Sequence, residues 1–370
     1  MRSLHVFIFS LVCIALAGVK SYAIVVVPDM KVKEFFFREN DTTSYMIKLA
    51  LDESGKPLYF FRNIFTPVCY TNECKPVHVN FYWDLLGNYM RYEMPEGKIL
   101  TKVDHDEFRP EDYQKLQDIL ARPNSIFADL EMKDLITEGT DNLSDSVDAK
   151  TGATLKTIKN EVIDGAVYTC FTLWKIAYGS AVNEMKKITE TYTTDELLHQ
   201  FLTSSNHHYQ YWAMEKVIRN GLVRKPFEKD IEKVISSKNI FIARTALKQT
   251  GSDFFTNSKK QVWLWNVFQS ASYPLQIAIL KKLTGIPLTN KLTEQIADQA
   301  VKSNQEQSGL MFNLLAAQPD LPVRTLKVLA SQLEHENADY TGKIYTLLER
   351  QKPGDHEIRK RMQRYKSSTN

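Results

Sequence analysis

One heptapeptide in this chain combines an acid, two hydroxyl side chains and two very small residues: Asp148-Ala149-Lys150-Thr151-Gly152-Ala153-Thr154. A phosphoester forms only on a hydroxyl, so a Thr in this setting is a candidate acceptor for a phosphate-bearing group. Gly152 and Ala153 keep the neighbouring backbone and hydroxyl accessible, because no larger side chain blocks a close approach. These residue types are compatible with the attachment of a phosphate-bearing group to a Thr hydroxyl.

A helix is predicted directly after the heptapeptide. Apolar residues recur at spacings of three and four, which indicates one amphipathic stripe. The stripe consists of Leu155, Ile158, Val162, Ala166, Cys170, Trp174 and Ala177. Thr151 or Thr154 is able to cap this helix, and its unpaired N–H groups and dipole would favour a phosphate dianion at its start.

The heptapeptide resembles the pattern Asp-x-x-Ser/Thr-Gly-Ala-Thr/Ser, at which FMN-binding domains of the Rnf complex and the sodium-pumping NADH:quinone reductase carry FMN. In that family a flavin transferase joins the FMN phosphate to the last Thr through a phosphoester. The resemblance implies that Thr154 is the acceptor and that Asp148 serves recognition by the transferase. The remaining matched residues are Thr151, Gly152 and Ala153, with Thr157 nearly repeating the family's usual continuation.

The same residues have a simpler interpretation as a loop that caps an ordinary helix, since Asp, Thr and Gly are common at turns and caps. The chain also departs from the family, because few of its 14 Gly precede the motif. Glycine-rich strands are usual there. The resemblance therefore implies the attachment site rather than the family's usual fold around it.

Three further strings resemble exported bacterial proteins of unknown function that carry this motif, a likeness that covers residues 60–180. They are Cys-x4-Cys, Trp-Asp-x-x-Gly-Asn from Trp83 to Asn88, and Tyr-x4-Leu-Trp-x3-Tyr-Gly from Tyr168 to Gly179. Aromatic residues in paired strands usually belong to the core. Trp83 and Tyr89 are nevertheless candidates to wall a flavin ring, because such pockets need flat apolar surfaces.

The pair Cys69 and Cys74 is expected to form a small-loop disulfide, since cysteines of exported proteins are normally oxidised. Two alternatives stay open. The pair could be a redox-active disulfide that exchanges electrons with the flavin, or it could begin a metal site with His78, for which no fourth ligand is evident. Cys170 lies on the apolar stripe and is expected to be a buried thiol.

The N-terminus has the features of a cleavable signal peptide, residues 1–23. Arg2 precedes an apolar run from Val6 to Val19, and Ser21-Tyr22-Ala23 resembles a signal-peptidase site. Removing this segment takes away Arg2 and Lys20, so the net charge falls from +3 to +1. That balance does not indicate a nucleic-acid partner. No second apolar segment reaches membrane length, so we expect a periplasmic or extracellular protein whose mature chain has no membrane span.

Residues 24–180 are predicted to form an α+β domain that carries the motif. Alternating apolar residues and turn signals between them indicate strands, at 24–27, 34–37, 44–51, 58–65, 77–84 and 89–94. Pro110 is expected to open a helix that runs to about Arg122. Residues 137–147 are polar and are predicted to be a loop that presents the motif.

Residues 181–350 are predicted to be all α-helical. They divide into five helix pairs with a period typical of a HEAT-like solenoid, at 195–221, 226–251, 257–285, 288–318 and 321–350. Gly221, Gly251 and Gly285 are expected to end helices. An all-α bundle without heptads is the alternative. Residues 351–370 are charged and polar, and we expect them to fray as a polar tail.

Together these features predict an extracytoplasmic flavoprotein that carries covalent FMN and shuttles electrons between redox partners. Its partners would be a flavin transferase and a redox protein docked on the helical domain. Electron transfer requires an exposed, oriented ring rather than acid–base residues, so we assign no catalytic side chains and no metal ligands. The alternative is a non-enzymatic exported binding or scaffold protein that uses the helical surface.

Overall fold

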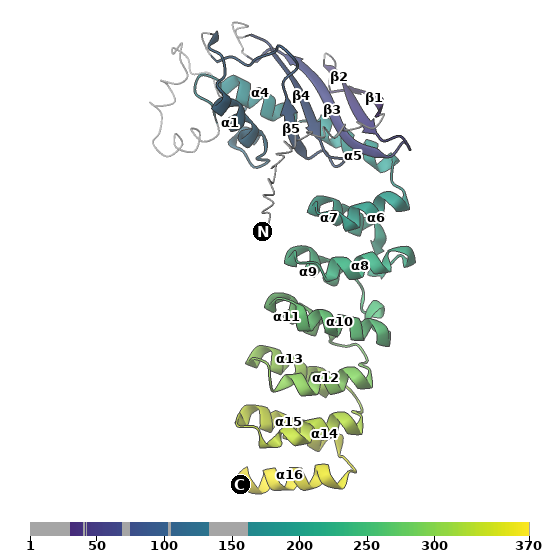
Figure 1. The fold of residues 1–370 in the computed structure, drawn as a ribbon. Coiled ribbons are helices and arrows are strands. Elements are labelled where there is room, and N and C mark those ends of the chain that lie inside the picture. The colour runs from purple at the N-terminus through teal and green to yellow at the C-terminus, as the bar shows by residue number, and fades with distance from the viewer. Residues whose placement is uncertain are drawn as a thin grey trace, which may run out of the picture. The chain divides into compact units, whose positions relative to one another are not determined.

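The computed structural model describes residues 30–369 except 40, 42, 69–74, 103–104 and 133–161 (Figure 1). The contacts divide the chain into two compact units, Met1–Thr189 and Glu190–Asn370. We refer to them as the sheet unit and the helical unit. An antiparallel sheet with helices in the first and helices throughout most of the second confirm an α+β region followed by a helical one.

The sheet unit contains a five-stranded antiparallel sheet in which the strands pair in chain order. The strands are β1 (Lys31–Arg38), β2 (Ser44–Leu51), β3 (Pro57–Thr66), β4 (Val77–Trp83) and β5 (Tyr89–Glu93). Tight turns connect β2 to β3 and β4 to β5, as the sequence predicts. The predicted strand at 24–27 lies outside the described residues.

The sheet has one buried face and one open face, because successive side chains of a strand point to opposite sides. On the buried face, Phe60, Val79 and Phe81 are fully enclosed. Among its described residues, this unit contains the α-helices α1 (Pro110–Leu120), α4 (Val167–Ala177) and most of α5 (Ala181–Thr191), and α1 contacts both β5 and α4. On the open face the Arg91 guanidinium lies 3.9 Å from the centre of the Tyr82 ring, which stacks beside Phe61.

The helix predicted from Leu155 to Ala177 is not continuous. In the described part of this stretch, residues 162–166 form a turn and α4 begins at Val167. Gly165 has a φ of 70°, a backbone conformation that interrupts a right-handed helix. The stripe residues Val162 and Ala166 are buried all the same. The prediction was wrong because it followed the apolar spacing and passed over Asp164-Gly165, a dipeptide typical of turns.

The helical unit consists of successive helix pairs followed by one more helix (Figure 1). The pairs are α6 (Asp195–Thr203) with α7 (His207–Val217), α8 (Glu228–Ile235) with α9 (Ile240–Gln249), α10 (Ser258–Ser270) with α11 (Tyr273–Leu283), α12 (Asn290–Ala300) with α13 (Gln305–Ala316), and α14 (Val323–Ser331) with α15 (Ala338–Gln351). The second helices form one row, in which α7, α9, α11, α13 and α15 each contact the next. These pairs occupy the five predicted segments.

One of the three predicted helix-ending glycines is confirmed. Gly285 follows α11 with a φ of 79°. Gly221 instead forms the turn between the two-residue strands β6 (Ile218–Arg219) and β7 (Leu222–Val223), after Asn220. Gly251 donates its N–H to the Gly221 oxygen at 2.7 Å. The two glycines allow a backbone contact, which a Cβ on Gly251 would obstruct at 2.9 Å from that oxygen.

The expectation that residues 351–370 fray is wrong, because they contain α16 (His356–Thr369). Asp355 caps this helix by accepting hydrogen bonds from the backbone N–H groups of Glu357 and Ile358. Ile358 is buried, and α16 contacts α14. A capping Asp and a single apolar anchor thus fix a segment whose overall composition is polar.

Candidate functional site

The residues of the predicted attachment site lie outside the described part of the structure. They are Asp148, Thr151, Gly152, Ala153, Thr154 and Thr157, within the segment 133–161. The same is true of Cys69, Cys74 and the signal-peptide residues 1–23. The site can therefore be approached through the described residues that flank it.

The described residues on the two sides of segment 133–161 pack against each other. Before it, Phe127 belongs to the short helix η2 (Ile126–Ala128), and its ring lies 5.7 Å from that of Phe171 in α4, after the segment. Lys175 of α4 donates a hydrogen bond to the Ala128 carbonyl at 3.1 Å. The chain is therefore anchored to the sheet unit at closely spaced points before and after the motif.

The string Trp83–Asn88 forms a turn that packs against α4 and α5. Trp83 has no exposed surface and donates its indole N–H to the Ala177 carbonyl at 2.8 Å. The Asp84 carboxylate accepts hydrogen bonds from the backbone N–H groups of Leu86 and Asn88 and from the Asn88 amide, at 2.8–2.9 Å. Trp83 is thus a core residue, and the prediction that it walls a flavin ring is not supported by its position.

The string Tyr168–Gly179 supplies further hydrogen bonds between distant segments. Trp174 donates to the Arg122 carbonyl at 2.9 Å, and Tyr178 donates to the Leu120 carbonyl at 2.7 Å. Tyr89 donates to the Gln117 amide oxygen at 2.9 Å. Burial raises the pKa of Tyr178 to about 12 and also raises the pKa of Tyr89. Both phenols therefore remain protonated donors at neutral pH, as structural hydrogen bonds require.

Cys170 is a buried free thiol, as predicted. Burial raises its pKa to about 12, so the reactive thiolate is scarce at neutral pH. The described residues contain no group of three or more His, Cys, Asp or Glu side chains arranged to hold a metal ion.

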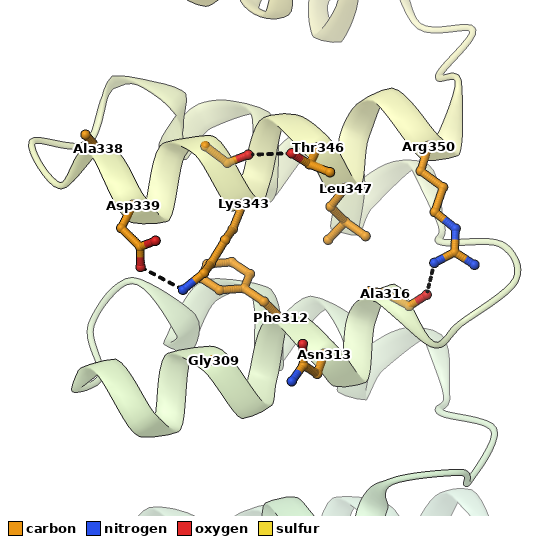
Figure 2. A pocket seen from close by; sticks show the side chains of 11 residues that line it. Gly309, Phe312, Asn313, Ala316, Ala338, Asp339, Lys343, Thr346, Leu347 and Arg350 are labelled. Carbon is orange, nitrogen blue, oxygen red and sulfur yellow. Dashed lines mark hydrogen bonds and ion pairs between the residues drawn. The ribbon is translucent and has the colours of Figure 1, made fainter.

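The helical unit has a groove of about 630 Å³ between α13 and α15. Figure 2 shows the residues that line it, which are Gly309, Phe312, Asn313, Ala316, Ala338, Asp339, Gly342, Lys343, Thr346, Leu347 and Arg350. Lys343 pairs with Asp339 at 2.7 Å, and Arg350 donates to the Ala316 carbonyl at 2.9 Å. The groove thus combines small residues, two apolar side chains and several polar groups.

Sequence reasoning missed the residues that cap the second helices of the pairs. The N-cap residues of α7, α9, α11, α13 and α15 are Asn206, Asn239, Ser272, Asn304 and Asn337. They follow one another at intervals of 33, 33, 32 and 33 residues. The four Asn side chains accept hydrogen bonds from N–H groups of the first turn. This spacing was visible in the sequence and aligns the five helices residue by residue.

Glutamine side chains accept hydrogen bonds from backbone N–H groups in the segments that precede the first helices of pairs. Gln318 accepts a hydrogen bond from the Leu288 N–H, and Gln351 accepts one from the Leu321 N–H, both at 3.0 Å. Gln261, which is fully buried, accepts from the Thr289 N–H at 2.8 Å and so ties α10 to the entry of α12. The first two bonds thus hold the end of a pair's second helix to the segment before its first helix, and the Gln261 bond joins neighbouring pairs.

No described helix has the length and apolar character needed to cross a membrane. Comparisons with models of protein families, with curated proteins and with solved structures find no match.

Proposed function

We propose that this protein is an extracytoplasmic electron carrier with FMN joined covalently to Thr154. The observation that supports the proposal is the heptapeptide Asp148–Thr154, which places a hydroxyl after Gly152-Ala153 as the covalently flavinylated family does. The apolar N-terminus agrees with it, because the family's flavin transferase acts outside the cytoplasmic membrane. A covalent bond would also retain a cofactor that is scarce there.

The sheet unit fits a supporting role. Phe127 and Lys175 anchor the chain before and after the motif segment. Of the two predicted ring contacts, Trp83 is enclosed in the core, whereas Tyr89 is only partly buried and stays a prediction. We therefore assign Thr154 the attachment of the cofactor. When bound, FMN would supply one- and two-electron transfer.

Coexpression with a flavin transferase tests this proposal. The wild-type protein is expected to give a band that fluoresces after denaturing electrophoresis, because a phosphoester survives unfolding. Thr154→Ala should abolish the fluorescence, whereas Thr256→Ala, a matched control at an exposed Thr outside the motif, should retain it. A dark wild-type band in the presence of an active transferase would contradict the proposal.

A second role is favoured by the groove between α13 and α15. We propose that the five helix pairs are HEAT-like repeats and that their row of second helices binds a partner protein. The regular cap positions support this assignment. In the electron carrier this partner would be a redox protein. In the alternative, a non-enzymatic binding protein, it would be the only function.

Complementation of a deletion strain separates these alternatives. An electron carrier requires the flavin, so Thr154→Ala should fail to restore the phenotype although the protein is exported and folded. If the protein only binds a partner, the Thr154→Ala variant should restore the phenotype of the deletion strain fully. Recovery of the mature N-terminus by mass spectrometry would report in the same experiment whether residues 1–23 are removed.

A further inference from the structure

Two glycines occupy the same position in neighbouring second helices. Gly309 is the fifth residue after the cap Asn304, and Gly342 is the fifth residue after the cap Asn337. The corresponding residues of the three preceding second helices all have large side chains, Tyr211, Arg244 and Ile277. The groove therefore opens where this position loses its side chain.

Neither the backbone nor the packing requires these glycines. Both lie inside helices, and neither has a positive φ. A Cβ added to either residue would meet no atom within 4 Å. A glycine in a helix interior costs roughly 0.5–1 kcal/mol relative to alanine. Stability alone thus favours alanine at both positions, and the free space is the one effect of glycine that remains.

The walls of this space suit an extended peptide. Phe312 and Leu347 form an apolar floor that is mostly buried, able to receive one apolar side chain. The Asn313 side chain forms no hydrogen bond with the described residues, and its amide offers both a donor and an acceptor. A peptide backbone presents both kinds of group. One Nη of Arg350 donates to Ala316, which leaves other N–H groups of the guanidinium available.

The positive charges beside the groove that lack an ion-pair partner in the described structure favour an acidic ligand. Asp339 neutralises Lys343, but among the described residues Arg350 has no carboxylate partner. The same row of helices continues with Arg244 and Lys248 of α9 and Lys281 of α11. These exposed cations also form no ion pair within the described ranges. Complementary potentials of this kind steer and orient binding.

We propose that the groove between α13 and α15 binds an extended acidic peptide segment of a partner protein. The acidic residue would meet Arg350, an apolar side chain a few residues away along the peptide would enter the space above Gly309 and Gly342, and Asn313 would pair with the peptide backbone. This proposal rests on the partner-binding role proposed for the helical unit and names the class of partner.

Selection of a random phage-displayed peptide library on the immobilised full-length protein tests the proposal. Enriched peptides are expected to combine Asp or Glu with an apolar residue. Synthetic versions should bind the wild type in fluorescence anisotropy and lose at least about tenfold in affinity, about 1.4 kcal/mol, on the double variant Gly309→Leu/Gly342→Leu. That variant should melt no lower than the wild type, because the added side chains fill open space.

Charge reversal provides the matched comparison. Arg350→Glu is expected to weaken binding by at least about tenfold, and Arg324→Glu, an exposed residue of α14 outside the groove, by less than about twofold. Three results would overturn the proposal: enrichment of basic or neutral peptides, binding unaffected by both groove variants, or no enrichment. Self-association of the wild type that the groove-filling variant abolishes would also overturn it, because a second copy would then be the occupant.

This outcome is independent of the flavin assignment. If peptides bind the helical unit equally well in both groove variants, the groove is not the binding site, but the partner-binding role proposed for the helical unit remains. Fluorescence of the Thr154 band is unaffected by either result.

Discussion

The sheet unit and the helical unit are held together by different kinds of hydrogen bond. In the sheet unit, individual side chains join segments far apart in the chain, as Trp83 joins Ala177 and Tyr178 joins Leu120. None of these contacts has a counterpart at a regular interval. In the helical unit, equivalent bonds recur from pair to pair, as the Gln318 and Gln351 contacts do.

This difference predicts different responses to damage. A fold that depends on single long-range contacts should lose stability as a whole when one of them is removed. Stability in an array of neighbouring pairs is closer to a sum of local terms. A measurement that resolves stability residue by residue should therefore show a unit-wide response to substitution in the sheet unit and a local response in the helical unit.

The largest effect is expected for Gly87→Ala in the sheet unit. Gly87 has a φ of 75°, and an added Cβ would lie 2.8 Å from Val182 Cγ1 and 3.1 Å from the Val182 carbonyl oxygen. The left-handed conformation and the crowding together should cost about 2–4 kcal/mol. Native-state hydrogen exchange should show faster exchange across the whole sheet unit. Acceleration restricted to residues 84–88 would show that the sheet unit responds locally, which contradicts the expected difference between the two units.

A smaller and local effect is expected for Asn304→Ala in the helical unit. The Asn304 side chain accepts the Gln307 N–H at 3.0 Å, and loss of such a cap costs about 1 kcal/mol. Exchange should accelerate in α13 and its neighbours and should stay unchanged in α6 and α7. Equal acceleration in all helix pairs would show that the helical unit, too, behaves as one cooperative body.

Gly342→Ala should stabilise the helical unit by roughly 0.5–1 kcal/mol, since helix propensity improves and the added Cβ meets open space. Thermal unfolding of the wild type and this variant measures the change. It is also the matched opposite of Gly87→Ala, because the same chemical change is made at a position that tolerates it. A lower melting temperature would contradict the view that Gly342 is there to provide space.

The smallest effect concerns pH. Asp112 is desolvated, which raises its pKa, but Lys102 at 2.8 Å and the Arg109 N–H outweigh this and lower its pKa overall. A carboxyl with a lowered folded-state pKa stabilises the fold above its unfolded pKa of about 3.9, and that contribution is lost as the pH falls through the folded value. Asp112→Asn should therefore flatten the acid limb of stability, by at most about 1 kcal/mol. Urea unfolding of both proteins at several acidic pH values measures this dependence. If the free energy of unfolding falls equally steeply with pH in the variant, Asp112 does not contribute to the acid sensitivity.

The sequence predicted the regular parts of both units because their signals are local. Alternation and the turn Asp52–Pro57 located β2 and β3, and helical spacing with Gly and Pro located the helix pairs. Cys170 was placed correctly, since an apolar stripe marks a buried face. The helix start at Val167 was missed because the Asp164-Gly165 turn interrupts a stripe whose residues remain buried.

The remaining features depend on contacts that spacing does not encode. Trp83 and Tyr89 are alike as aromatic strand residues, and their spacing does not reveal that Trp83 is fully buried and bonded to the distant Ala177 carbonyl. Gly309 and Gly342 become informative once the Asn caps align their helices. The attachment motif is the opposite case, because its residue types alone suggest its chemistry.

Covalent attachment of FMN to Thr154 can be tested by measuring the intact mass of the protein exported from a host that has a flavin transferase. The mature chain is expected to be heavier by one FMN less one water, and fragmentation should locate the added mass on Thr154. The Thr154→Ala protein should have its unmodified mass. An unmodified wild-type mass, or the addition on another residue, would show that Thr154 does not carry FMN.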